Sequence, residues 1–312
     1  MSAVAKRQPT LVVLGGINMD LIALTQHMPR PGETVTGDLF YTTPGGKGGN
    51  QAVAAARMGA DVHMVGRVGT DTFGPELVND MSRDGIDVSG IASDPEAASG
   101  IAMIMLDGQR QNYITQVRGA NLRADGTQVD AAKGALQGAD ALMVQLELPF
   151  EVTLEVAQAA RKLGVTVFWD PAPPHPDMER ALEAVDVITP NQNEAHFLTE
   201  IEVTDAESAE QAARALLGKG IPTVVIKMGE MGAFYATSEG SGFVPGFEIK
   251  PVDSVAAGDA FGGALAVSMA EGLALSEAVR RGCAAGALAC TKQGAQAAMP
   301  TRTEVEALLA PS

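Results

Sequence analysis

Residues 253–261, Asp-Ser-Val-Ala-Ala-Gly-Asp-Ala-Phe, combine a possible anion-binding backbone with a carboxylate. A small, apolar run follows, which predicts a loop leading into the first turn of a buried helix. The free amides and dipole at a helix start favour an anion, and Ala256, Ala257 and Gly258 are too small to block a phosphate. Asp259 beside such a site is suited to taking a proton from a hydroxyl that attacks a phosphoryl group. On these residues alone, an ordinary first-turn helix acid is the simpler interpretation.

A polar pair follows the first predicted strand. Asn18 and Asp20 alternate with apolar neighbours, so they share one face of an extended segment. Ligands bind at the carboxyl ends of strands in open α/β sheets, and an amide next to a carboxylate suits vicinal hydroxyls. A polar turn is the alternative interpretation.

A glycine-rich segment at 44–51, Pro-Gly-Gly-Lys-Gly-Gly-Asn-Gln, opens a predicted helix. Its four glycines allow close approach of a ligand to the backbone. Gly48 stands where a Walker A loop has Ser or Thr, so the segment is not such a loop. Lys47 and Asn50 are candidates to bind polar groups of a substrate, and a flexible turn is the alternative.

Further candidates lie at later strand ends. Glu147 follows a buried strand, and Asn191 and Glu194 stand three residues apart at a helix start. An amide with a carboxylate suits water-mediated Mg²⁺ binding, although a capped helix start gives the same pattern. Lys227 begins a loop with two glycines, 227–232. This loop is a weak candidate for binding one edge of a nucleotide.

Short apolar strands alternate with helices along the chain. Strands are expected at 11–14, 62–65, 141–145, 165–169, 185–188 and 223–227, and helices at 51–58, 75–83, 150–163, 193–198 and 208–217. This alternation predicts an α/β fold with a mostly parallel sheet covered on both faces. Segments 35–43, 101–106 and 112–117 break the rhythm, and Asp107-Gly108 predicts a hairpin. These pieces suggest a small extra sheet that covers a cleft or another subunit.

Composition restricts the class of protein. The 312 residues are 46% hydrophobic and carry a formal net charge of −16, which argues against nucleic acid or an anionic membrane surface as partner. No apolar run is long enough to span a membrane, and the polar segment 1–10 does not resemble a signal peptide. The two cysteines favour buried thiols and a cytoplasmic location. No linker divides the chain, so a single domain over 1–312 is expected.

Taken together, these segments resemble the ribokinase family of carbohydrate kinases, the PfkB group, over nearly the whole chain. The matching motifs are residues 15–20, 30–34, 45–52, 188–194, 253–261 and 292–295. The resemblance implies a three-layer α/β/α sandwich with a small β-sheet lid, formed by about 21–24, 35–43, 101–106 and 112–117. It also implies a homodimer that forms through the lid.

The resemblance further assigns roles to residues. Asp259 is implied as the catalytic base, and Ala256, Ala257 and Gly258 as the anion hole. The sugar is expected to contact Asn18, Asp20, Gly46, Lys47, Asn50, Glu147 and Asp259. The nucleotide side is expected to include Asn191, Lys227, Gly229, Gly232, Gly258 and Cys283, with Glu194 holding Mg²⁺ through water. A monovalent-cation site for K⁺ is implied at Asp253, Val255, Ala289, Lys292, Gly294 and Ala298.

The activity implied is ATP-dependent phosphorylation of the 5-hydroxyl of D-ribose, which gives D-ribose 5-phosphate and ADP. The same chemistry on deoxyribose, another sugar or a nucleoside is the main alternative. A sugar-binding protein without catalysis is a third, which the intact Asp259 and its glycine loop disfavour.

Overall fold

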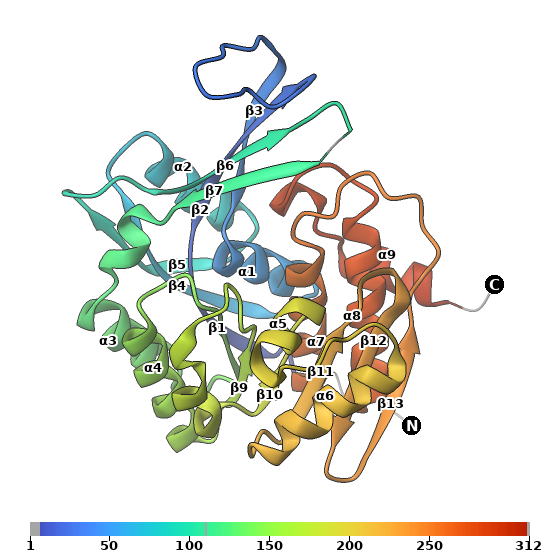
Figure 1. Ribbon diagram of the computed structural model, residues 1–312. Coiled ribbons are helices and arrows are strands. Elements are labelled where there is room, and N and C mark those ends of the chain that lie inside the picture. The colour runs from blue at the N-terminus through green and yellow to red at the C-terminus, as the bar shows by residue number, and fades with distance from the viewer. Residues whose placement is uncertain (1–6, 110, 311–312) are drawn as a thin grey trace.

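The computed structural model describes residues 7–109 and 111–310 (Figure 1). Residues 1–6 of the polar N-terminal segment and Arg110 of the expected hairpin turn lie outside the described residues. Within these ranges, no helix has the length and apolar character that crossing a bilayer requires.

A nine-stranded sheet forms the centre of the body. Its strand order is β13-β12-β11-β10-β9-β8-β1-β4-β5, and all neighbouring pairs are parallel except the two antiparallel pairs that β12 forms with β11 and β13. The strands are β1 (Thr10–Leu14), β4 (Asp61–Gly69), β5 (Asp87–Asp94), β8 (Ala141–Val144), β9 (Thr166–Trp169), β10 (Val187–Ile188), β11 (Thr223–Lys227), β12 (Gly232–Thr237) and β13 (Gly240–Pro245). The predicted mostly parallel sheet is confirmed.

Helices cover both faces of this sheet. They are α1 (Lys47–Arg57), α2 (Phe73–Arg83), α3 (Gly126–Ala135), α4 (Phe150–Leu163), α5 (Gln192–Thr199), α6 (Ala206–Gly218), α7 (Ala257–Ala270), α8 (Leu275–Ala289) and α9 (Arg302–Leu309). Val12 and Leu14 of β1 pack in the core that α3, α4 and α6 cover, whereas Leu11 and Val13 pack in the core beneath α1, α7 and α8. Because successive side chains of a strand point to opposite faces, one apolar strand serves both cores and the three layers follow.

The start of α1 differs from the expected start at Gln51. The helix begins at Lys47, so two glycines of the glycine-rich segment lie in its first turn. The amide of Gly49 donates to the carbonyl of Gly16 at 3.1 Å. A Cβ on Gly48 would lie 2.5 Å from the carbonyl carbon of Gly15, so only glycine fits there. Close packing against the end of β1 therefore overrides the low helix propensity of glycine.

Other boundaries differ less. Strand β10 is shorter than the expected 185–188, because the amide of Val185 donates to the carbonyl of Leu182 in the preceding 3₁₀ turn. Several elements had no sequence expectation: β5, β12, β13, α3 and α9. The helix at 150–163 and the strand at 223–227 have the expected boundaries.

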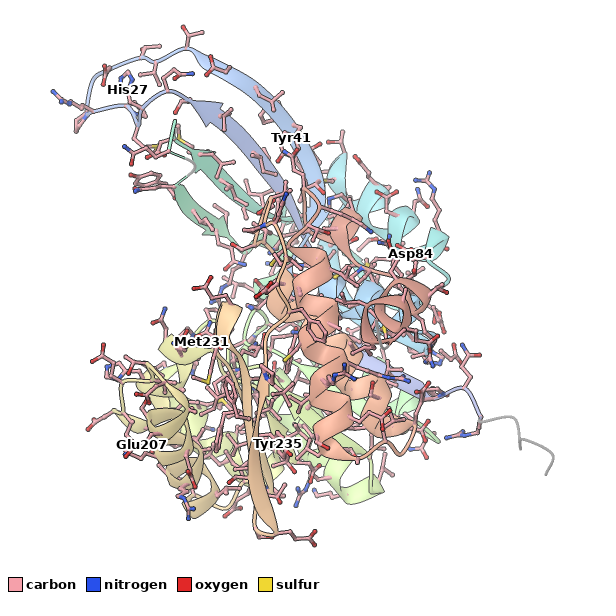
Figure 2. The ribbon with its side chains drawn as sticks, turned by 90° about the vertical axis from the view of Figure 1, so that its right-hand side faces the viewer. His27, Tyr41, Asp84, Glu207, Met231 and Tyr235 are labelled. Atoms are coloured by element: carbon pink, nitrogen blue, oxygen red, sulfur yellow. The ribbon has the colours of Figure 1, made fainter. Side chains whose placement is uncertain are left out.

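A separate four-stranded sheet, the lid, projects from the body (Figure 1). Its strand order is β3-β2-β6-β7, with β2 (Asn18–Thr25), β3 (Gly37–Gly45), β6 (Gly100–Leu106) and β7 (Asn112–Val117). Ile22, Ala102 and Ile104 form a small apolar cluster on it. Figure 2 shows the lid strands extending away from the body, with His27 at the far end and Tyr41 nearer the base. The predicted lid is confirmed.

Candidate active site

The polar residues singled out in the sequence gather where strands of the large sheet end and the lid begins. Asn18 opens β2, Glu147 follows β8, Asn191 follows β10, Lys227 ends β11 and Asp259 lies in the first turn of α7. The carboxyl ends of parallel strands meet at one edge of a sheet, so positions far apart in sequence converge there.

Asp259 is buried and held by two amides. Nδ2 of Asn50 donates to its Oδ2 at 2.9 Å, and Nε2 of Gln51 donates to its Oδ1 at 3.1 Å. Nζ of Lys47 lies 3.9 Å from Oδ1. Burial raises the pKa of Asp259 above its usual range; Lys47 opposes that shift, and the charge of Asp170 adds to it. A fixed carboxylate with a raised pKa is well suited to accept a proton.

The backbone before Asp259 turns sharply into α7. Ala256 has φ 60° and ψ 9°, in the left-handed region that alanine rarely adopts. The amide of Ala257 lies 3.4 Å from the carbonyl of Ser254, which is a long hydrogen bond. The dipole of this helix and its first-turn amides suit a negatively charged group beside Gly258.

Asn18 and Asp20 lie buried at the base of the lid. Nδ2 of Asn121 donates to Oδ1 of Asn18 at 2.9 Å and to the carbonyl of Ile17 at 3.1 Å. Burial raises the pKa of Asp20 to about 7, with further contributions from the charges of Glu147 and Asp259. Sequence reasoning missed Asn121, because it lies in a 3₁₀ turn that no motif marked.

Glu147 connects the body to the lid and to α1. Its Oε2 accepts the amide of Lys47 at 2.8 Å, and its Oε1 accepts Nε2 of Gln116 on β7 at 2.6 Å. Burial raises the pKa of Glu147, although the charge of Lys47 opposes the shift. A Cβ on Gly16 would lie 2.3 Å from Oε2, so this glycine makes room for the carboxylate. Gln116 was also missed.

Asp170, directly after β9, is a further buried carboxylate that sequence reasoning missed. Nζ of Lys227 lies 2.8 Å from its Oδ1, and Nζ of Lys47 lies 3.3 Å from its Oδ2. Nε2 of Gln51 also donates to Oδ2, at 3.2 Å. Burial alone would raise the pKa of Asp170, but the two lysine charges outweigh it and the pKa is lowered. The position of Asp170 at a strand end is the signal that could have identified it.

Asn191 and Glu194 form a capping box at the start of α5. The amide of Asn191 donates to Oε2 of Glu194, and its Nδ2 donates to Oε1, both at 2.8 Å. Burial raises the pKa of Glu194, and so does the charge of Asp170, whereas Lys227 and Lys47 oppose the shift. Residue 191 also pairs with residue 227 in an isolated bridge, so this carboxylate and Lys227 belong to one neighbourhood.

The remaining nucleotide-side candidates are spread over three elements. Gly229 has φ 60° in a 3₁₀ turn after β11, and Cys283 lies buried on α8, where burial raises the pKa of its thiol to about 12. A Cβ on Gly232 would lie 2.0 Å from the carbonyl oxygen of Val244, so the antiparallel pairing of β12 and β13 accounts for that glycine.

Two loops meet at Asp253. Its Oδ1 accepts the amide of Val255 at 3.0 Å, and its Oδ2 accepts the amide of Gly294 at 3.2 Å. The ammonium of Lys292 instead contacts Glu304 at 2.7 Å. The six residues of the implied cation site therefore fall into two groups. Asp253, Val255 and Gly294 are joined directly, whereas Ala289, Lys292 and Ala298 lie in the adjoining turn and helix ends.

A cavity of about 300 Å³ lies between the lid and these loops. Asp20, Ile22 and Tyr41 line it from the lid, and Asp253 and Gly294 line it from the body. Its size matches the lower end of the range for small-molecule sites. Apolar residues of the lid, Ile104 and Leu106, also line it, so the cavity leaves space for a small ligand next to Asp20.

Residues 8–302 match the model of the pfkB family of carbohydrate kinases. A ribokinase of Haemophilus influenzae is 39% identical over 295 residues, which cover 95% of this chain and 96% of that protein. A deoxyribokinase of Salmonella typhi is 31% identical, covering 93% of this chain and 95% of that protein.

The chain belongs to the pfkB family of carbohydrate kinases. Among solved structures, the ribokinase of Arabidopsis thaliana complexed with ribose and ATP superposes with a TM-score of 0.90 at 29% identity, covering 98% of this chain and 100% of that chain. The expected family, the three-layer fold with its lid and the class of enzyme are thereby confirmed.

Proposed function

We propose that this kinase transfers the terminal phosphoryl group of ATP to the 5-hydroxyl of D-ribose, giving D-ribose 5-phosphate and ADP. The observation that carries the proposal is Asp259, buried in the first turn of α7 with both oxygens held by Asn50 and Gln51. The similarity to named ribokinases supports ribose as the acceptor.

Asp259 takes the proton of the 5-hydroxyl as the oxygen attacks the terminal phosphorus and the bond to the ADP oxygen breaks. The amides of Ala257 and Gly258, at the start of α7, stabilise the charge on the transferring group. The site fixes both reactants in line, and that positioning supplies much of the rate. The lid limits the access of water, which would otherwise compete as acceptor.

The sugar is held between the body and the lid. Asp20 accepts hydrogen bonds from adjacent ring hydroxyls, while Asn18 is aligned by the amide of Asn121. Glu147, Lys47 and Gly46 complete the sugar site. A Cβ on Gly46 would lie 2.7 Å from the backbone nitrogen of Asn18, so this glycine lets the two segments pack together. The cavity between the lid and the body supports the contact with Asp20, which lines it.

The nucleotide and its magnesium ion bind on the opposite side of Asp259. Among the described residues, no group of three His, Cys, Asp or Glu is arranged to hold a metal. Mg²⁺ retains several waters and uses phosphate oxygens, so one buried carboxylate reaching it through water fits this donor set. We assign that role to Glu194, with Asn191, Lys227, Gly229 and Cys283 along the nucleotide; bound Mg²⁺ supplies charge neutralisation to the phosphates.

A monovalent cation such as K⁺ is proposed at the junction of the two loops near Asp253. The carboxylate is fixed by the amides of Val255 and Gly294, and oxygen ligands of this kind suit a hard cation.

The two cysteines are free thiols, which supports a reducing, cytoplasmic location.

The lid supports a homodimer. Phe40, Met103, Tyr113 and Val117 share the lid face opposite Ile22, and their exposed fractions are 63%, 50%, 45% and 50%. An exposed apolar patch of this kind marks an interaction surface. We infer that a second copy of the chain covers it.

A second acceptor has a specific observation in its favour, the similarity to a deoxyribokinase. A coupled assay of ADP release with ribose, deoxyribose, fructose and a nucleoside, run in sodium and then in potassium, tests both acceptors. The highest kcat/KM on ribose supports the proposal, and a higher value on deoxyribose overturns it.

A further inference from the structure

Lys227 directs its ammonium group toward the start of α7. Its Nζ lies 2.8 Å from Oδ1 of Asp170, which is buried. A Cβ built on Gly258 would lie 3.4 Å from the same Nζ. Because Gly258 belongs to the first turn of α7, this ammonium stands beside the amides suited to an anion.

Asp170 joins this lysine to a second one. Its Oδ2 lies 3.3 Å from Nζ of Lys47, which is in turn 3.9 Å from Oδ1 of Asp259. The buried carboxylate of Asp170 therefore links the ammonium of Lys47, on the proposed sugar side, to the ammonium of Lys227, at the start of α7. Such a link fixes the distance between the two charges, because each is bound to a different oxygen of the same group.

The two ammonium groups of Lys47 and Lys227 are the positive charges in a region rich in buried carboxylates. Four buried carboxylates lie close to them: Glu147, Asp170, Glu194 and Asp259. A terminal phosphate brought to the start of α7 adds further negative charge, and a positive group placed there in advance lowers the free energy of the transition state.

We propose that Lys227 is a catalytic residue that contacts the transferring phosphoryl group, and that Asp170 is a positioning residue for both Lys227 and Lys47. On nucleotide binding, Lys227 exchanges part of its contact with Asp170 for an oxygen of the terminal phosphate. No proton is transferred in this exchange. The inference deepens the proposed function and rests on phosphoryl transfer at this site.

The first test is calorimetric titration with ADP and with a non-hydrolysable ATP analogue, both with magnesium. Lys227→Met is expected to weaken binding of the analogue by at least tenfold and that of ADP by less than threefold, because only the analogue carries the terminal phosphate. Equal losses for the two nucleotides overturn the contact. This measurement needs no sugar, so it remains decisive if ribose proves to be the wrong acceptor.

The second test is a double-mutant cycle measured by kcat. Lys227→Met is expected to lower kcat by about 100-fold with less than threefold change in sugar KM, and Lys227→Arg to recover part of that loss. Removing Lys227 alone leaves Asp170 with one charged partner fewer, which can impair folding. The combined Asp170→Asn and Lys227→Met variant avoids that imbalance.

The double variant separates catalysis from charge balance. If Lys227 acts on the phosphoryl group, the double variant keeps the full loss of kcat. If Lys227 serves only to neutralise Asp170, the double variant regains the rate of the unaltered protein, and the proposal fails. Lys219→Met is the matched control, since Lys219 contacts Glu179 at 2.7 Å away from the site; its kcat is expected to be unchanged.

The positioning role of Asp170 has its own readout. Asp170→Asn is expected to reduce the preference for the analogue over ADP while leaving thermal unfolding within a few degrees. A loss of stability with unchanged nucleotide preference assigns Asp170 a purely structural role and overturns this part of the inference.

Discussion

Gln116 on the lid strand β7 donates a hydrogen bond of 2.6 Å to Glu147, which follows β8 of the body. This contact ties the lid to a buried carboxylate of the body. Its geometry makes the position of the lid depend on the same group that holds the amide of Lys47. With Glu147 proposed as a sugar ligand, we expect sugar binding and lid position to be coupled through this side chain.

Replacing Gln116 tests this coupling. Gln116→Ala is expected to raise the KM for the sugar by about tenfold with a smaller change in kcat, because a hydrogen bond to a charged group contributes about 1.5 kcal/mol or more. Steady-state kinetics at saturating ATP measures both constants. Gln109→Ala, in the exposed turn of the same hairpin, is the control. An unchanged KM would show that the lid is positioned by other contacts.

Asp259→Asn tests the proton acceptor. We expect kcat to fall by about 10³-fold, since a general base contributes roughly 10²–10⁴-fold. Circular dichroism and thermal unfolding are expected to show a folded protein, because the substituted side chain keeps its shape. Asp130→Asn, an exposed acid on α3, is the control. Turnover equal to that of the unaltered protein would refute the assignment.

The raised pKa of Asp20 predicts a pH dependence of sugar use. With a pKa of about 7, Asp20 is protonated in acid and ionised above neutrality. The ionised form accepts hydroxyl hydrogen bonds at both oxygens, whereas the protonated form presents one oxygen as a donor. The kcat/KM for the sugar should therefore rise with pH through about 7. Asp20→Asn should lower kcat/KM and flatten this part of the profile. A profile of the same shape in the variant would place the titration elsewhere.

The same group affects stability in the absence of sugar. The folded protein holds the Asp20 proton more tightly than the unfolded chain does, because the pKa is raised from 3.8 to about 7. The stabilising contribution is present below pH 3.8 and is lost as pH rises through about 7. Asp20→Asn should therefore raise the free energy of unfolding at pH 8 by up to about 4 kcal/mol relative to its effect at low pH. Urea titrations at both pH values measure this difference.

The lid face predicts an oligomeric state. Phe40→Asp should shift the protein from dimer to monomer, because burying an unpaired carboxylate in an apolar interface is unfavourable. Sedimentation velocity measures the mass directly. Phe197→Asp is the control, since Phe197 is an exposed aromatic residue on α5, away from the lid. A monomeric unaltered protein, or a dimer that survives Phe40→Asp, would contradict this interface.

Part of the site follows from local sequence rules. Asp259 was placed at a helix start because small residues precede it and an apolar run follows, and the structure has that arrangement. Glu147 and Asn191 were found because polar residues at strand ends face a common edge. Asp170 obeys the same rule, because it directly follows β9.

The sequence by itself determined the alternation of apolar strands with helices and the residues that end each strand, because periodicity and small residues are local properties. Tertiary structure alone decided the contacts of Gln116, Asn121 and Gln51, whose partners lie 31, 103 and 208 residues away. A glutamine or asparagine carries no local mark of its future partner, since the hydrogen bond exists only after the sheet edge and the lid have come together. The charge pairs of Asp170 with Lys47 and Lys227 arose in the same way, from three strand and helix ends that meet at one edge.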